Sequence, residues 1–108
     1  MTASKTWIRV ARVSDIDSTI PFFVEVNNRA VALYRAHDVV YATDDTCSHA
    51  EASLCAGEYH GYIVTCPRHG GQFDIRTGQA VKMPASVPID VFPVRIENGE
   101  VFLSLDDV

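Results

Sequence analysis

The sequence predicts an all-β protein, folded as an antiparallel β-sandwich or partial barrel. Short segments rich in β-branched and aromatic residues recur along the chain, and turn-forming residues separate them. No segment shows a long helical period, so the pattern favours a sandwich or barrel over a mixed fold. The chain has 108 residues, of which 47% are apolar. We therefore expect a single domain over residues 1–108 with one modest hydrophobic core.

The expected strands follow one another with short connections. Asn27-Asn28 separates two of them as a tight hairpin turn. Asn98-Gly99 predicts a type I′ turn, because both residues tolerate the positive φ angles that this turn requires. The strands expected in chain order are 6–13, 22–26, 30–35, 39–43, 62–66, 72–78, 91–96 and 101–105.

The charge balance excludes one class of partner. The chain has 9 Lys and Arg residues against 14 Asp and Glu residues, and its net charge is −5. A nucleic-acid binder needs a basic patch that releases counterions from phosphates, and the sequence has no Lys/Arg cluster. We expect no nucleic acid as a partner, whereas a mildly acidic surface suits a partner with a basic docking face.

The N-terminal segment and the cysteines indicate the compartment. Residues 1–13 contain no apolar run behind a basic end, which argues against a secretory signal. No stretch approaches the roughly 20 apolar residues that span a bilayer. The three cysteines, an odd number, argue against a disulfide scaffold. We therefore expect a cytoplasmic protein with no membrane association.

Two loops carry the residues with distinctive chemistry. We call residues 46–54 loop one, which holds Cys47 and His49, and residues 66–74 loop two, which holds Cys66 and His69. Thiolate and imidazole ligands suit both zinc and iron, so the spacing has to decide between the metals. A zinc finger usually takes both cysteines from one knuckle and both histidines from a helix, whereas here each loop offers one of each. In a Rieske [2Fe–2S] cluster, one iron takes two cysteines and the other takes two histidines, and this arrangement fits better.

These motifs resemble the Rieske family. The resemblance covers CSHA in loop one, Leu54 and Gly57 in the spacer, and CPRHGGQFDIRTGQA, and it continues through the Pro84 loop to the last hairpin. The chain is most similar to the stand-alone ferredoxins of bacterial multicomponent aromatic-ring-hydroxylating dioxygenases. The resemblance implies a β-sandwich base and a small cluster-binding subdomain, at about residues 44–84, made of the two ligand loops. It also implies one [2Fe–2S] cluster on Cys47, His49, Cys66 and His69.

The same resemblance implies a function in aromatic hydrocarbon catabolism. The chain would be a monomer that carries single electrons from a flavin-containing, NAD(P)H-dependent reductase to a terminal Rieske non-haem iron oxygenase. It would not be an enzyme, because the 2-His-1-carboxylate site of an oxygenase needs a catalytic domain. Only His37 and His60 remain beside the cluster ligands, and most of the chain is already committed to the Rieske fold. Two alternatives stay open: a structural zinc module that binds a protein, and a subunit that works only within a permanent complex.

The neighbours of the ligands predict a low reduction potential within the Rieske range of roughly −150 to +300 mV. Respiratory Rieske proteins carry a Ser and a Tyr that donate hydrogen bonds to cluster sulfurs, and the matching residues here are Gly71 and Phe73. Those proteins also join their loops by a disulfide, where this chain has Ala52 and Arg68. Without the hydrogen bonds that such Ser and Tyr hydroxyls donate, the reduced cluster is less stabilised.

Three further residues could be mistaken for ligands. Cys55 lies in the spacer, outside the pattern, and we expect it to pack as a small apolar residue. His37 and His60 lie in short polar segments, where we expect solvated turns.

Overall fold

The computed structural model describes residues 6–46, 53–68, 70–83 and 87–105. These ranges contain two short 3₁₀ turns, η1 (Val13–Asp15) and η2 (Leu54–Ala56), and a series of β-strands. The strands are β1 (Ile8–Arg12), β2 (Phe22–Val26), β3 (Arg29–Ala36), β4 (Val39–Asp44), β5 (Glu58–His60), β6 (Ile63–Thr65), β7 (Gln72–Asp74), β8 (Ala80–Lys82), β9 (Val91–Phe92), β10 (Val94–Glu97) and β11 (Glu100–Leu103).

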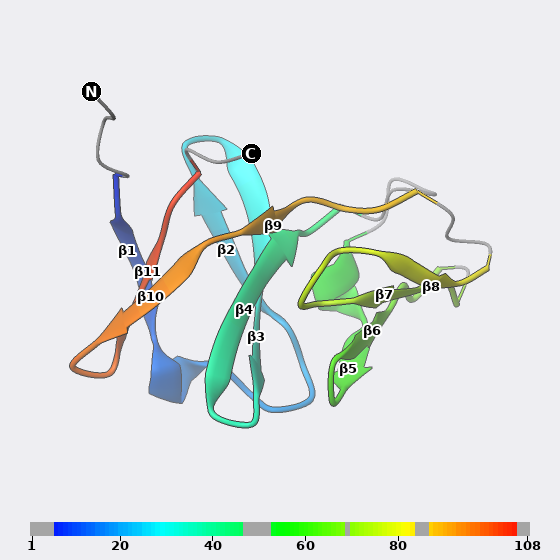
Figure 1. Ribbon diagram of the computed structural model, residues 1–108, viewed down its shortest axis with the longest axis horizontal. Coiled ribbons are helices and arrows are strands. Elements are labelled where there is room, and N and C mark those ends of the chain that lie inside the picture. The colour runs from blue at the N-terminus through cyan, green and yellow to red at the C-terminus, as the bar shows by residue number, and fades with distance from the viewer. Residues whose placement is uncertain (1–5, 47–52, 69, 84–86, 106–108) are drawn as a thin grey trace.

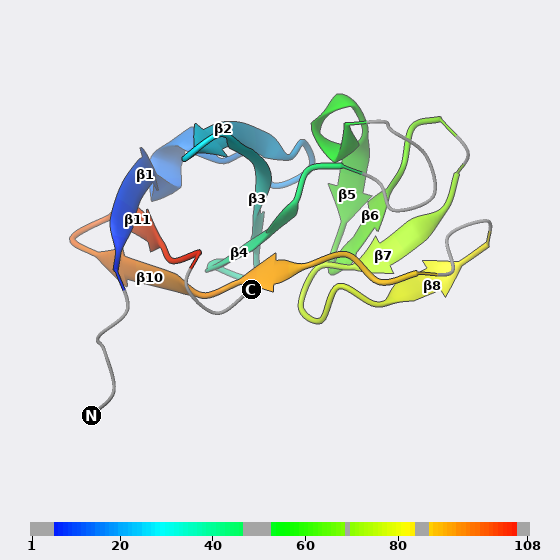
Figure 2. The ribbon, with the colours of Figure 1, turned by 90° about the horizontal axis from the view of Figure 1, so that it is seen from above.

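The strands form three antiparallel sheets, in the orders β1-β11-β10, β2-β3-β4-β9 and β5-β6-β7-β8. The first two sheets curl around a common interior (Figure 1). We call these two sheets together the base. The third sheet lies beside the base at one end of the molecule, as the view from above also shows (Figure 2). We call it the distal sheet. The predicted all-β antiparallel fold is confirmed.

The central strand β3 joins the base to the distal sheet because both of its faces are buried. Alternate residues of a strand point to opposite faces. Val31 and Leu33 belong to the core of the base, whereas Ala32 and Tyr34 belong to a second core under the distal sheet. The ring of Tyr34 meets that of Tyr59 from β5 edge-on, with 5.1 Å between their centroids. The distal sheet is therefore packed directly on the outer face of the base.

The predicted hairpin turns are confirmed by the backbone angles. Asn27 and Asn28 have φ values of 52° and 67°, and Asn98 and Gly99 have 53° and 77°. His37 and Asp38 form a similar turn between β3 and β4, with φ values of 52° and 63°. The expected turn around His37 is thus present.

Some boundaries differ from the sequence prediction. The expected strand 91–96 is two strands, which are separated at Pro93 because proline has no N–H for a ladder bond. The expected strand 72–78 ends at Asp74, where the chain turns toward Gly78 with φ +80°. Strands β5 and β8 were not predicted, because three residues are too short for an alternating pattern to stand out.

Candidate functional site

Loop two begins with a tight turn that closes the β6–β7 hairpin. The Cys66 N–H donates to the Gly71 carbonyl at 2.8 Å, and the Gly70 N–H donates to the Cys66 carbonyl at 3.0 Å. Gly70 has φ +77°, a conformation that favours glycine, and no heavy atom lies within 4 Å of the place a Cβ would take. Cys66 itself is 1% exposed, whereas Pro67 and Arg68 are exposed. The turn therefore holds a buried thiol under a solvent-facing tip.

The two ends of loop one are joined at Asp45. Thr46 and Ser53 form an isolated antiparallel bridge, and the Leu54 N–H donates to the Asp45 carbonyl at 2.6 Å. The Asp45 side chain accepts the Ser53 hydroxyl at 2.6 Å and the Cys55 N–H at 2.8 Å. The two ends of loop one therefore lie next to each other, just after β4.

The segment that follows loop one packs against the start of loop two. A Cβ on Gly57 would lie 2.5 Å from the Thr65 carbonyl oxygen and 3.2 Å from Cδ of Pro67, so only glycine allows this approach. Leu54 and Cys66 share the core under the distal sheet. Beside them a cavity of about 600 Å³ is lined by residues that include Cys55, Gly57, Cys66 and Gly70.

The structure places one of the four predicted ligands. Cys66 lies at the start of loop two, as expected. Cys47, His49 and His69 lie outside the described residues, so the complete ligand set stays a prediction. In the described ranges, no three His, Cys, Asp or Glu residues are grouped as they would be around a metal ion.

The other candidate residues have ordinary surroundings. The exposed His37 ring packs on Tyr62, with 5.1 Å between centroids, and His60 lies 3.5 Å from the Glu58 carboxylate. Cys55 is half-buried against the core under the distal sheet. Burial raises the pKa of the Cys55 thiol, and its hydrogen bond to Asp45 adds to the rise. The raised pKa favours the protonated thiol, which is a poor nucleophile, and agrees with the expected packing role of Cys55.

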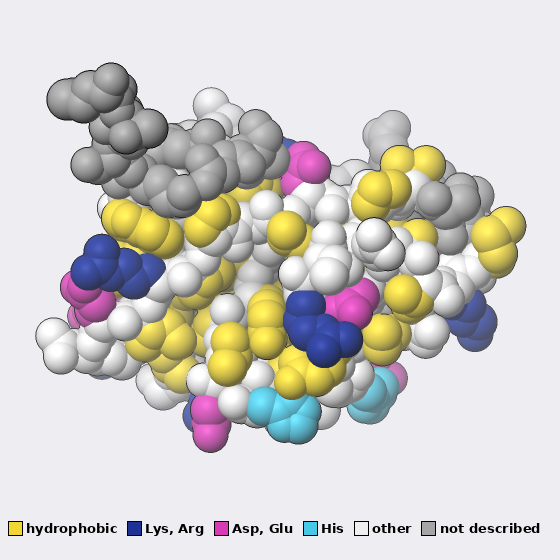
Figure 3. Space-filling view, in the orientation of Figure 1, with side chains coloured by type: hydrophobic (Ala, Val, Ile, Leu, Met, Phe, Trp, Pro, Cys, Tyr) yellow, Lys and Arg dark blue, Asp and Glu magenta, His cyan; other side chains and the backbone are white. Residues whose placement is uncertain are grey.

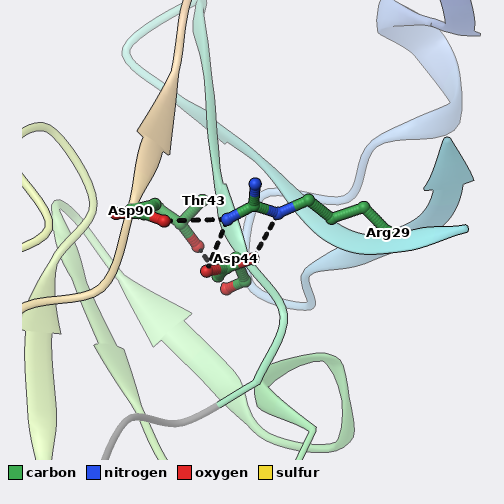
Figure 4. Close-up of polar contacts among 4 residues, drawn as sticks. All are labelled: Arg29, Thr43, Asp44 and Asp90. Carbon is green, nitrogen blue, oxygen red and sulfur yellow. Dashed lines mark hydrogen bonds and ion pairs between the residues drawn. The ribbon is translucent and has the colours of Figure 1, made fainter. Parts of the chain in front are cut away.

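Arg29 fastens the two chain segments that connect the base with the distal sheet. Its guanidinium bonds both carboxylate oxygens of Asp44 at 3.2 Å and one oxygen of Asp90 at 2.8 Å (Figure 4). It also lies over the ring of Phe92, 4.9 Å from the centroid. Asp44 leads into loop one, Asp90 leads back to β9, and the Asp44 N–H donates to the Asp90 carbonyl at 2.9 Å. Sequence reasoning found neither this network nor Asp45, because acidic residues near a strand end look like ordinary surface residues.

The residues present fit an iron–sulfur cluster. A buried thiol that lines a cavity and a neighbouring glycine with open space around it leave room for a group on Cys66. Thiolate is the soft ligand that such clusters take.

Comparisons with known proteins agree with this fit. The model of the Rieske [2Fe-2S] domain matches residues 6–93. The "Ferredoxin CarAc" of Metapseudomonas resinovorans is 39% identical over 102 residues, which are 94% of this chain and 95% of that protein. The "Naphthalene 1,2-dioxygenase system, ferredoxin component" of Pseudomonas putida is 37% identical over 92% of this chain and 95% of its own length. A solved "Complex of reduced oxygenase and oxidized ferredoxin in carbazole 1,9a-dioxygenase" contains a chain that is 38% identical, with a TM-score of 0.85 and 94% of each chain covered.

The fold and the matched residues define a Rieske-type iron–sulfur protein, whose cofactor is one [2Fe–2S] cluster. Within that class, this chain belongs to the family of the Rieske ferredoxins of aromatic-ring dioxygenase systems. The prediction of an electron-transfer component rather than a catalytic subunit is confirmed by this kinship. In the part of the chain that the structure describes, no helix is long and apolar enough to cross a bilayer.

Proposed function

We propose that Cys47, His49, Cys66 and His69 hold the [2Fe–2S] cluster, with both thiolates on one iron and both imidazoles on the other. When bound there, the cluster takes up and releases one electron at a time. We propose that the chain carries this electron from a flavin-containing, NAD(P)H-dependent reductase to a terminal Rieske non-haem iron oxygenase. The observation that carries the proposal is the buried thiol of Cys66, which lies where the segment after loop one packs against the start of loop two.

The burial of Cys66 supports different roles for the two ligand types, with the cysteine side shielded from solvent and the histidine side open to a partner. Cys66 lies in the core with Leu54, Phe73 and Tyr59, so its side of the site is closed to solvent. The tip of loop two, at Pro67 and Arg68, faces solvent. We therefore expect electrons to leave on this solvent-facing side, through the two proposed histidine ligands, because loops run over the surface.

The surface around the loops suits a partner. Hydrophobic side chains gather at the end of the molecule that carries β7 and β8 (Figure 3). Val81 is 51% exposed, Met83 73% and Val87 57%; Lys82 between the first two is exposed, as is Arg68 in loop two. A small patch of apolar side chains with few charges fits a weak, short-lived redox encounter.

The named complex of a related ferredoxin with its oxygenase supports an oxygenase as one partner. A reductase is implied because an electron carrier has to be reduced again after each transfer, and the relatives are named as components of multi-protein systems. We also propose that the chain acts as a cytoplasmic monomer and as one domain over residues 1–108. The distal sheet supports a cluster-binding subdomain at about residues 44–84, because β5 to β8 all lie within that range.

The docking face can be tested by matched charge reversals. Arg68→Glu should slow electron transfer to the oxygenase, by roughly three- to tenfold at low salt, without changing the visible spectrum of the cluster. Arg12→Glu makes the same change of charge on an exposed residue at the end of β1, in the base. It should leave turnover in a reconstituted reductase–ferredoxin–oxygenase chain unchanged. Equal effects of the two variants, or an effect of Arg12→Glu alone, would place the docking face elsewhere.

A further inference from the structure

A buried carboxylate lies at the base of loop one. Asp45 is 4% exposed, although it is a charged residue. Burying a carboxylate costs free energy unless hydrogen bonds replace its water. Both oxygens of Asp45 have such partners: Oδ1 accepts the Cys55 N–H at 2.8 Å, and Oδ2 accepts the Ser53 hydroxyl at 2.6 Å.

The backbone of Asp45 is fixed as well. Its N–H donates to the Ala30 carbonyl at 3.1 Å, which ties it to β3 in the base. Its carbonyl accepts the Leu54 N–H at 2.6 Å. Asp45 therefore connects one rigid strand to three consecutive residues, 53–55, where loop one ends.

The neighbouring acidic residue has a different position. Successive side chains of an extended chain point to opposite sides. The Asp44 carboxylate bonds Arg29, whereas the Asp45 carboxylate bonds the end of loop one. The two residues carry the same charge, but only Asp45 contacts residues that close the loop.

We propose that Asp45 is the positioning residue of loop one: its carboxylate closes the loop and so fixes where Cys47 and His49 are presented to the cluster. The inference rests on the proposed ligand set, because Cys47 and His49 lie between Asp45 and Ser53 in the chain. A cluster is released when a ligand loop opens, and the release rate follows the population of the opened loop. Weakening the closure should therefore speed release of iron and change the environment of the ligands.

Two effects have to be separated, because Asp45 could act through its charge alone. Ser53→Ala removes one hydrogen bond to the carboxylate and changes no charge. Asp45→Asn removes the charge and one acceptor oxygen. Asp44→Asn removes the same charge one residue away. It weakens the pair with Arg29 but leaves the hydrogen bonds of the Asp45 carboxylate intact.

The experiment uses the purified, cluster-loaded protein and these three variants. Iron release to an excess of a strong iron chelator is followed by the loss of visible absorbance, and the reduced proteins are compared by electron paramagnetic resonance. Ser53→Ala should release iron about tenfold faster, the change expected when a hydrogen bond to a charged group is lost. Asp45→Asn should release it at least as fast, and both variants should shift the resonance positions. Asp44→Asn should keep the resonance positions of the parent protein and should speed iron release less than Ser53→Ala does, because it weakens only the pair with Arg29.

The outcomes are distinct. Parent-like release and spectra in Ser53→Ala, with equal changes in Asp45→Asn and Asp44→Asn, would mean that Asp45 acts through its charge, and would overturn the inference. If Asp45→Asn does not load a cluster, the comparison of Ser53→Ala with Asp44→Asn still separates the effect of the hydrogen bond from that of the charge. A parent protein without an iron–sulfur signal would instead contradict the proposed function.

Discussion

Gly78 lies directly against the carbonyl group of Ile89. A Cβ on Gly78 would stand 2.0 Å from the Ile89 oxygen, and Gly78 has φ +80°. The Ile89 N–H also donates to the Gly78 carbonyl at 2.8 Å. This contact fixes the segment that returns to the base against the turn between β7 and β8.

Replacing Gly78 should weaken the fold. Gly78→Ala should lower the free energy of unfolding by about 2–4 kcal/mol, because it combines a positive φ with a clash against backbone. Gly61→Ala is the control, since Gly61 has φ +59° but no heavy atom within 4 Å of the position that an alanine Cβ would occupy. The control should cost only about 1 kcal/mol in urea unfolding. Equal losses in the two variants would show that the contact with Ile89 is unimportant.

The Arg29 network should stabilise the junction between the base and the distal sheet. Its side chain is 36% exposed, so the ion pairs are partly screened. Arg29→Lys should lower the free energy of unfolding by about 1 kcal/mol, because lysine cannot bond Asp44 through two nitrogens. The loss should shrink at high salt. Arg9→Lys, which alters an exposed pair with Glu100, should change the free energy of unfolding by less. A larger loss in Arg9→Lys than in Arg29→Lys would contradict the account.

A hydroxyl beside the cluster should raise the reduction potential. Phe73 is fully buried in the same core as Cys66, and it lacks the hydroxyl that respiratory Rieske proteins direct at a sulfur. Phe73→Tyr should raise the potential by about 20–60 mV, the equivalent of one hydrogen bond that favours the reduced state. Protein-film voltammetry measures this shift. A potential that stays constant or falls, with an intact spectrum, would refute the hydrogen-bond argument.

The ligands can be separated from the spacer cysteine. Cys47→Ser and His69→Ala should each lose the visible absorbance of the cluster and part of the fold, since metal binding orders its own loops. Cys55→Ala should keep the spectrum, because the Cys55 thiol is protonated and packs in the core. Bleaching by Cys55→Ala would show that the wrong cysteine has been assigned.

The sequence predicts those parts of the structure that local chemistry determines. Asn27-Asn28 and Asn98-Gly99 form the expected turns because their side chains tolerate positive φ. Strands β5 and β8 were missed because three residues carry too little pattern. The role of Gly57 depends on Thr65 and Pro67, which contact it only in the folded chain.

The candidate site follows the same division. The spacing of two Cys–His pairs predicts a Rieske cluster, because the motif itself contains the ligand residues. Asp45 could not be predicted, since its burial and its bonds to Ser53 and Cys55 arise only when loop one returns to β4. The Arg29 network joins residues that are 15 and 61 positions apart, which no local pattern reveals.

Metal analysis of the purified protein tests the central claim most directly. Protein made with adequate iron should contain about two irons and about two acid-labile sulfides per chain, the composition of one [2Fe–2S] cluster. It should be red-brown and should give a paramagnetic signal only after reduction by one electron. A colourless protein with stoichiometric zinc would contradict the account, because zinc would then be the metal held by these loops.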